Sequence, residues 1–365
     1  MNLIQILPEW APNIHPMLVH FPIGLLVVAV LMDLLQWFRL FRERLDLTAV
    51  LLYTFGSLGC IAAFWSGRIA SETVQVSIQA QTVMSDHDDW ALFTVIFFLI
   101  FTNIRIALFV FQKDQLFTSR MVLPLVALVG IGLLWQTGEL GKELVYKHGV
   151  GVAAVDVEEP DLDFTAESRF ERRDDGWLWT AGSDADEAFQ DHFQMSGEQS
   201  GRISFQTGGD DEGAYLEIHA DDVDVPVFLT VPESVGDISL EAGIHMDDFE
   251  GRIGLVHHFH GEGHYEFMDF VDDYVRLGRH EQGEDDILED GQRHPHGWTS
   301  LRVVADGRHF HAYTDGDMTA HGHASEWEPG YTGLFVDGEG VIRLRMLHLV
   351  LLRETDYVHQ EVDHQ

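Results

Sequence analysis

Two histidines, His15 and His20, lie at the start of the first long apolar segment, in the sequence HPMLVHFP. Ionisable residues at the edge of a membrane-spanning segment usually have a function. His87 and His148 are the other histidines of the first 150 residues. We expect these four to bind a cofactor, either haem b through axial imidazoles or a copper, zinc or iron ion. A proton relay and the capping of helix ends are the alternatives.

The positions of these rings around a helix limit which of them can act together. His15 and His20 are five residues apart, about 140° around a helix axis. They therefore cannot face one ligand unless the helix begins after Pro16. If only one of the four histidines points into the bundle interior, we expect it to be His20, and His87 is the next candidate.

A second group of metal ligands is predicted between His257 and Glu266, in the sequence HHFHGEGHYE. If its Gly-Glu-Gly forms a hairpin turn, His260 faces His264 and His258 faces Glu266, with all four side chains on one sheet face. This set would bind a transition metal and release it below about pH 6. The alternative is that these histidines share a face by chance, because 17 of the 21 histidines lie after residue 150. The same two-residue spacing recurs at His294/His296, His309/His311 and His321/His323.

Four apolar segments that would position the first group are long enough to cross a membrane. They run over residues 17–38, 48–69, 90–111 and 121–135, and the last is short unless Gln136 and Thr137 also lie at membrane depth. A cleaved signal peptide is the alternative for the first, but no Lys or Arg precedes it.

The basic residues predict the orientation of these segments. Arg and Lys lie in the first and third connections, and acidic residues lie in the second. The positive-inside rule then places both chain ends, the four histidines and the C-terminal domain on the outer side. Arg105, beside Asn103, is expected to extend its side chain towards the inner interface.

Charge divides the chain into two parts. Residues 1–150 have a net charge of −2, whereas the remaining 215 residues contain 13 Arg, no Lys and 49 acidic residues, a net charge of −36. A surface this acidic remains soluble in concentrated salt, so we infer a halophilic source. Nucleic acid is excluded as a partner, because few positive charges are left to neutralise its phosphates.

Cys60 is the only cysteine and lies in the second apolar segment. One cysteine excludes an intrachain disulfide, a c-type haem and an iron–sulfur cluster held by this chain alone. Any metal must therefore be bound by histidines and carboxylates.

The charged part of the chain has the pattern of a β-sandwich. An acidic, proline-containing linker is expected at 153–177, a sandwich at 178–354 and a tail at 355–365, with hairpin turns at Asp306-Gly307 and Asp315-Gly316. The predicted fold class is α + β multidomain: a four-helix transmembrane bundle over residues 1–152, then an all-β jelly-roll sandwich. The expected strands are 203–206, 215–219, 227–231, 238–245, 253–260, 265–271, 301–305, 309–314, 331–336 and 342–352.

The helical part resembles a bacterial membrane family, domain of unknown function 2231. The resemblance is carried by the HPMLVHFP start, Ser66-Gly67, Asp86-His87 and the sequence GELGKELVYKHGVGV over 138–152. It covers roughly residues 10–155. It implies a small four-helix membrane bundle in a respiratory or redox setting, without a defined reaction.

The charged part resembles the concanavalin A-like, laminin-G-like jelly roll of the 3-keto-disaccharide hydrolase-type family, over about residues 178–354. The resemblance is carried by the motifs GRIGL, YEF, GWTSLRV, FHAYTDG and GYTGLF, in this order between residues 251 and 335. It implies a fold and no activity. A retaining glycosidase of this fold would carry close carboxylates on one strand, as in Glu-x-Asp-x-x-Glu; we treat hydrolysis as the weaker expectation and leave enzyme activity open.

Two functions are consistent with these features. The preferred one is an outward-facing component of a redox or respiratory system. In it the bundle binds haem b or a metal through His15, His20, His87 and His148, and the sandwich binds a cytochrome or another partner protein. The alternative is a non-redox membrane anchor that presents a glycan- or protein-binding jelly roll. In both, membrane lipid surrounds the helices.

Overall fold

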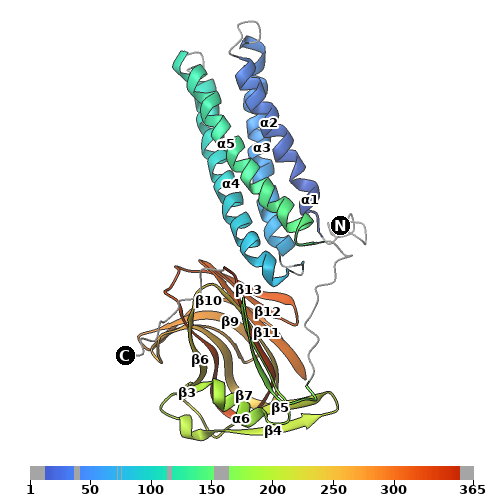
Figure 1. Cartoon of the computed structure of the whole chain (residues 1–365). Coiled ribbons are helices and arrows are strands. Elements are labelled where there is room, and N and C mark those ends of the chain that lie inside the picture. Colours follow the sequence, from blue (N-terminus) through green and yellow to red (C-terminus); the bar gives the residue numbers. More distant parts are fainter. Residues whose placement is uncertain are drawn as a thin grey trace, which may run out of the picture. The chain divides into compact units, whose positions relative to one another are not determined.

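The computed structural model describes residues 13–36, 42–71, 73–74, 76–112, 117–151 and 164–353. They belong to two compact units, Met1–Asp156 and Val157–Gln365 (Figure 1). The first unit is helical and the second consists mainly of antiparallel strands, which confirms the expected fold class. The expected tail at 355–365 lies outside the described residues.

Within the described residues, the helical unit has four stretches that are long and apolar enough to cross a membrane: His15–Leu35, Leu45–Ser71, Ile78–Val110 and Met121–Tyr146. The fourth extends well past Gln136 and Thr137, so it reaches full length. The helices are α1 (His15–Leu18), α2 (His20–Leu35), α3 (Arg42–Ser71), the 3-10 turn η3 (Ile78–Ala80), α4 (Gln81–Val110) and α5 (Phe117–Tyr146).

One face of α2 forms part of the bundle core. Its buried residues are Pro22, Leu26, Ala29, Val30 and Asp33, spaced as one side of a helix requires. Leu26, Ala29 and Val30 pack in a cluster with residues of α3, α4 and α5. The other faces carry exposed apolar side chains, as a helix in contact with lipid requires.

A buried ion cluster joins three of the helices. Arg105 Nη2 of α4 lies 3.1 Å from Asp33 Oδ1 of α2 and 3.2 Å from Asp46 Oδ1 of α3. The Arg105 and Asp33 side chains are 2% and 3% exposed, and Gln36 Nε2 also donates to Asp33 Oδ1 at 3.2 Å. The expectation that Arg105 reaches the interface is wrong, because two carboxylates at its own depth neutralise it inside the bundle.

The β unit is organised by two strands of 22 residues, β7 (Ile238–Phe259) and β14 (Gly330–Leu351). They pair antiparallel from Ile238↔Leu351 to Phe259↔Tyr331. At the middle, Gly251 is opposite Gly338, with φ values of +140° and +156°. A Cβ on either glycine would lie 2.4 Å from a carbonyl oxygen of the other strand, so only glycine fits this bend.

Each half of these long strands belongs to a different sheet. The first half of β7 pairs with β11, and the second half pairs with β8. The second half of β14 pairs with β5 and β2, whereas its first half pairs with β6. Sheet I therefore contains β1, β2, β4, β5, β11, β12 and β13 beside the long strands, and sheet II contains β3, β6, β8, β9 and β10.

The remaining elements of this unit have the following bounds: β1 (Arg169–Arg173), β2 (Gly176–Thr180), α6 (Ala185–His192), β3 (Gln194–Ser196), the 3-10 turn η4 (Ser200–Arg202), β4 (Ile203–Asp210), β5 (Gly213–Ala220), β6 (Val227–Val235), β8 (His264–Val271), β9 (Tyr274–Glu281), β10 (Glu284–Gln292), β11 (Trp298–Asp306), β12 (His309–Thr314) and β13 (Asp317–His323). The core lies between the two sheets and contains Leu240 and Ile244 from sheet I and Leu255, Met268 and Leu277 from sheet II.

Several expected boundaries change. The linker predicted at 153–177 contains strand β1 and the start of β2, whose Trp177 is buried; residues 152–163 lie outside the described residues. The strand pairs expected at 238–245 and 253–260, and at 331–336 and 342–352, are single strands, β7 and β14. The acidic residues between these segments favour turns in the sequence, but they lie exposed or half-buried within continuous strands. The turns at Asp306-Gly307 and Asp315-Gly316 are confirmed.

We expect Arg105→Met to lower the free energy of unfolding by about 3–5 kcal/mol, because it leaves two buried carboxylates with no counter-charge. Thermal denaturation of the detergent-solubilised protein would measure this loss. Neutralising the carboxylates in the same background, with Asp33→Asn and Asp46→Asn, should recover part of it. Lys142→Met is the control, since it removes only an exposed ion pair with Glu139; equal effects of the Arg105 and Lys142 variants would refute a role for the buried charges.

Candidate functional site

His15 and His87 are held by the same kind of contact in two different helix pairs. His15 Nδ1 of α1 lies 3.0 Å from the carbonyl oxygen of Ala63 and 3.0 Å from Ser66 Oγ, both on α3. His87 Nδ1 of α4 lies 3.0 Å from the carbonyl oxygen of Thr137 on α5. If each Nδ1–H donates to its carbonyl, Nε2 carries the lone pair that can bind a metal.

A glycine lies against each of these rings, four residues after the carbonyl. A Cβ on Gly67 would lie 3.1 Å from His15 Cε1, and a Cβ on Gly141 would lie 3.1 Å from His87 Cε1. The bundle thus contains two matching histidine positions, each formed by a carbonyl and a glycine of a neighbouring helix.

The other two predicted cofactor ligands have different surroundings. His20 is exposed, so the expectation that it points inward is wrong. The reason is that the buried face of α2 starts at Pro22, and His15, seven residues earlier, continues this face while His20 does not. His148 follows α5 and is half-buried, and its Nε2 is buried without a hydrogen-bond partner within the described part of the chain.

The metal site predicted in the β unit is divided by a bulge. His258 has φ +46°, and this shifts the register so that His257, instead of His258, is opposite Glu266. The backbone of His260 donates to the carbonyl of His264 at 3.0 Å, as the predicted hairpin requires. The four predicted ligands nevertheless do not converge on one point.

His258 and Glu266 belong to a buried ion cluster with Arg279. Glu266 accepts a hydrogen bond from Arg279 Nε at 2.6 Å, and its other oxygen lies 2.8 Å from His258 Nδ1 and 3.4 Å from His257 Nδ1. His257 and Glu266 are 0% and 1% exposed. Since Arg279 already neutralises Glu266, this cluster has the character of a structural ion pair.

His260 and His264 instead line a surface pocket with Trp327 and two glutamates. The His264 ring stacks on Trp327 at 3.9 Å, and the Arg279 guanidinium lies 4.8 Å from the centre of the same indole. Trp327 therefore contacts both the pocket and the buried cluster. The pocket offers aromatic and acidic groups to a ligand.

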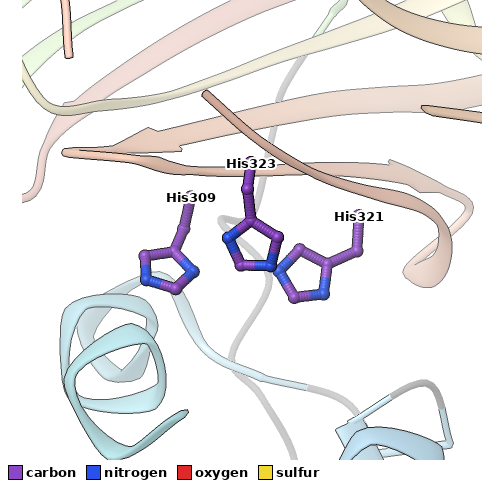
Figure 2. Close-up of side chains that lie close together, drawn as sticks. All are labelled: His309, His321 and His323. Atoms are coloured by element: carbon purple, nitrogen blue, oxygen red, sulfur yellow. The ribbon is translucent and has the colours of Figure 1, made fainter. Parts of the chain in front are cut away.

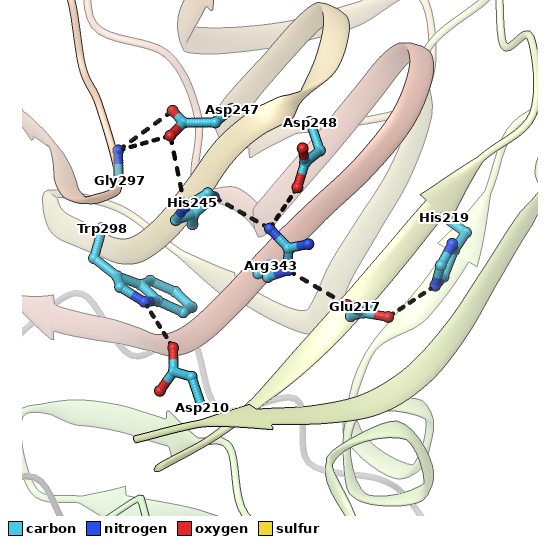
Figure 3. Close-up of polar contacts among 9 residues, drawn as sticks. All are labelled: Asp210, Glu217, His219, His245, Asp247, Asp248, Gly297, Trp298 and Arg343. Carbon is cyan, nitrogen blue, oxygen red and sulfur yellow. Dashed lines mark hydrogen bonds and ion pairs between the residues drawn. The ribbon is translucent and has the colours of Figure 1, made fainter. Parts of the chain in front are cut away.

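A polar and aromatic surface covers the solvent face of sheet I, where residues alternate with core residues along each strand. We call it the polar face; it consists of Tyr215, Glu217, His245, Trp298, Arg343 and Arg345. Figure 3 shows that the charged groups around Arg343 form a connected network across β5, β14 and β7, and that Trp298 of β11 pairs separately with Asp210 of β4.

Arg343 is at the centre of this network. Its Nε lies 3.3 Å from Glu217 Oε1, and its Nη1 lies 2.7 Å from Asp248 Oδ2 and 3.4 Å from His245 Nδ1. Asp247 accepts hydrogen bonds from the backbone N–H of Gly297. These contacts hold the side chains in defined positions while the Arg343 side chain remains 23% exposed.

Trp298 forms the aromatic part of the polar face. Its Nε1 donates to Asp210 Oδ2 at 3.3 Å, and the Arg345 guanidinium lies 3.9 Å from the ring centre. Tyr215 lies 5.8 Å from the indole and His245 lies 5.7 Å from it, centre to centre. Sequence reasoning did not find this site, because its residues are dispersed over four strands and only their register brings them together.

Carboxylates with the Glu-x-Asp-x-x-Glu spacing are present once in the sequence, at Glu284, Asp286 and Glu289. They lie on β10, with a bulge between Ile287 and Glu289. All three are solvent-exposed, whereas a general acid needs an environment that disfavours its charge. The arrangement is therefore that of an acidic edge strand.

Residues 11–154 match the family described as "Predicted membrane protein (DUF2231)". This match confirms the resemblance of the helical half. No curated protein matches the chain.

Solved structures that are similar to the chain include the following three. The carbohydrate binding module CBM66 from Bacillus subtilis is 16% identical, with a TM-score of 0.34, and 41% of this chain and 95% of that chain are covered. A protein of unknown function with a galectin-like fold from Bacillus subtilis is 10% identical, with a TM-score of 0.35 and coverages of 43% and 88%. The exoplasmic/lumenal domain of VIP36 in its Ca²⁺/Man3GlcNAc-bound form is 14% identical, with a TM-score of 0.32 and coverages of 45% and 90%.

The buried cluster of His257, His258, Glu266 and Arg279 predicts that acid destabilises the β unit. Burial lowers the pKa of His257 from 6.5 to about 3. Burial raises the pKa of Glu266. The hydrogen bond from His258 and the nearby positive charges together lower it by more, so the pKa of Glu266 lies below its usual value. Below about pH 6.5, His257 takes up a proton in the unfolded chain but not in the folded one. For this group the free energy of unfolding therefore decreases by about 1.4 kcal/mol for each unit by which the pH is lowered.

Urea unfolding between pH 7 and pH 4, followed by tryptophan fluorescence, would measure this slope. The variant His257→Gln should be less stable at pH 7 but should lose less stability as the pH falls. The variant His296→Gln, at an exposed position, should keep the original slope. A His257→Gln protein with an unchanged pH dependence would show that this histidine is not the group that titrates.

Proposed function

We propose that this protein is a membrane-anchored binding protein whose β-sandwich binds a neutral glycan on the polar face. The observation that supports this most directly is the surface around Trp298, where an aromatic ring is surrounded by fixed charged groups on four adjacent strands. A sugar ring presents C–H groups that pack on an aromatic face and hydroxyls that bond to charged side chains.

The charges of the polar face favour a neutral ligand. Arg343 is paired with Glu217 and Asp248, and Arg345 is paired with Asp210 and Glu212. The guanidinium charges are therefore balanced, and the net charge of the chain, −38, repels polyanions. A neutral oligosaccharide avoids this repulsion and can still use both donors and acceptors.

In this proposal the helices anchor the protein in lipid and the sandwich faces the outer side, as the distribution of Arg and Lys between the spans indicates. The absence of Lys after residue 147 and the excess of acidic residues suit work in concentrated salt. High salt would screen the self-repulsion of the sandwich.

Binding of neutral oligosaccharides of glucose, galactose, mannose and fructose to the full-length protein, measured by calorimetry in detergent, would test the glycan proposal. We expect Trp298→Ala and Arg343→Ala each to weaken binding at least tenfold, because both truncate central contacts. Tyr274→Ala removes an exposed aromatic ring on β9 and is the control. Absence of binding to the whole panel, or equal binding by the Trp298→Ala protein, would contradict the proposal.

A second function is favoured by the paired histidines of the bundle: binding of haem b or a metal ion, and with it a place in electron transfer beside a respiratory or cytochrome partner. Ligand histidines usually donate their second ring nitrogen to a carbonyl or carboxylate, and the contacts of His15 and His87 have this form. His15 replaces His20 as the proposed partner of His87.

A reduced-minus-oxidised spectrum and elemental analysis of the purified protein would test this second function. We expect His15→Ala and His87→Ala each to abolish the haem bands or the stoichiometric metal. His20→Ala, at an exposed position of the same helical segment, should change neither. A wild-type protein with no haem and no bound metal would eliminate the redox function and leave the bundle as an anchor.

A further inference from the structure

A hairpin at the edge of sheet I carries four histidines on one face. β12 and β13 are joined by the turn Asp315-Gly316, and their register places His309 opposite His323 and His311 opposite His321. Phe310, which lies between His309 and His311, and Ala320, which precedes His321, both belong to the core. The four imidazoles therefore project from the other face of the sheet. Figure 2 shows that three of them, His309, His321 and His323, point to the same side.

The rings are close enough to share one ion. Ring centres are 4.4 Å apart for His311 and His321, 4.6 Å for His321 and His323, and 4.8 Å for His309 and His323. His309, His321 and His323 each offer a ring nitrogen, and these three atoms lie within 4.8 Å of one another. Ligand nitrogens about 2.0–2.1 Å from a zinc ion are closer together than this, so small side-chain rotations would complete the site.

His311 lies beside these three histidines but outside the group whose ring nitrogens are within 4.8 Å of one another. It is 3% exposed, and its Nδ1 is buried without a hydrogen-bond partner among the residues that the structure describes. A buried nitrogen of this kind is costly unless it binds something. Its nearest imidazole neighbour is His321 of the same cluster.

We propose that His309, His311, His321 and His323 bind a divalent transition-metal ion of the zinc or copper class. Imidazole suits these ions, whereas Ca²⁺ and Mg²⁺ prefer oxygen ligands. Neutral ligands leave the ion its positive charge, which the surrounding acidic domain attracts. The ion would join the edge strand β13 to its neighbour β12 through ligands from both, independently of the polar face and of the bundle histidines.

The test uses the full-length protein in detergent, stripped of metal with a chelator and made in a His15→Ala/His87→Ala background. This background separates the hairpin site from the proposed site in the bundle. Zn²⁺ or Cu²⁺ is added in the presence of excess Mg²⁺, which occupies the surface carboxylates, and bound metal is counted by elemental analysis after desalting. We expect one ion per chain.

Removal of hairpin ligands should remove the ion. The variant His321→Gln/His323→Gln should weaken binding at least 100-fold, and His323→Gln alone, at an exposed position, should weaken it at least tenfold without disturbing the fold. His294→Gln/His296→Gln has the same spacing on an exposed loop and should bind like the parent protein. No stoichiometric ion, or equal binding by the His323→Gln protein, would overturn the proposal.

Discussion

The antiparallel pairing of β7 with β14 over their whole length is the constraint on which the rest of the β-sandwich depends. Because each strand contributes to both sheets, the bend at Gly251 and Gly338 determines where one sheet ends and the other begins. Leu240 and Leu255 of the same strand therefore lie in opposite walls of one core. The first half of β7 also aligns β11, and β11 aligns the histidine hairpin.

The sequence was sufficient to predict the two units, the four spans and the β class, since apolar length and alternation are local properties. It was insufficient for side-chain direction in the bundle. His15 and His20 have the same type and similar neighbours, and only the packing of Pro22 on α3 determines which one faces inward. The pairing of Arg105 depends on two acidic residues from other helices, which no local pattern reveals.

In the β unit, strand register was likewise not predictable from the sequence. A single residue, His258, adopts a positive φ and exchanges the partners of its neighbours, so strict alternation predicted the wrong pair. The hairpin at Asp315-Gly316 has one small irregularity, between Ala312 and Tyr313, and its histidines keep the alternation. The polar face could not be assembled from the sequence at all, because its residues are up to 130 positions apart.

The ion cluster of the bundle has a consequence for how the protein is made. Its members come from α2, α3 and α4, and synthesis delivers the two acidic helices before the basic one. An unpaired carboxylate is costly at membrane depth, so α2 and α3 reach their final position only when α4 arrives with Arg105. Biogenesis of the bundle is therefore cooperative over three helices, and a nascent chain that ends after α3 lacks the cation that lets the earlier helices settle.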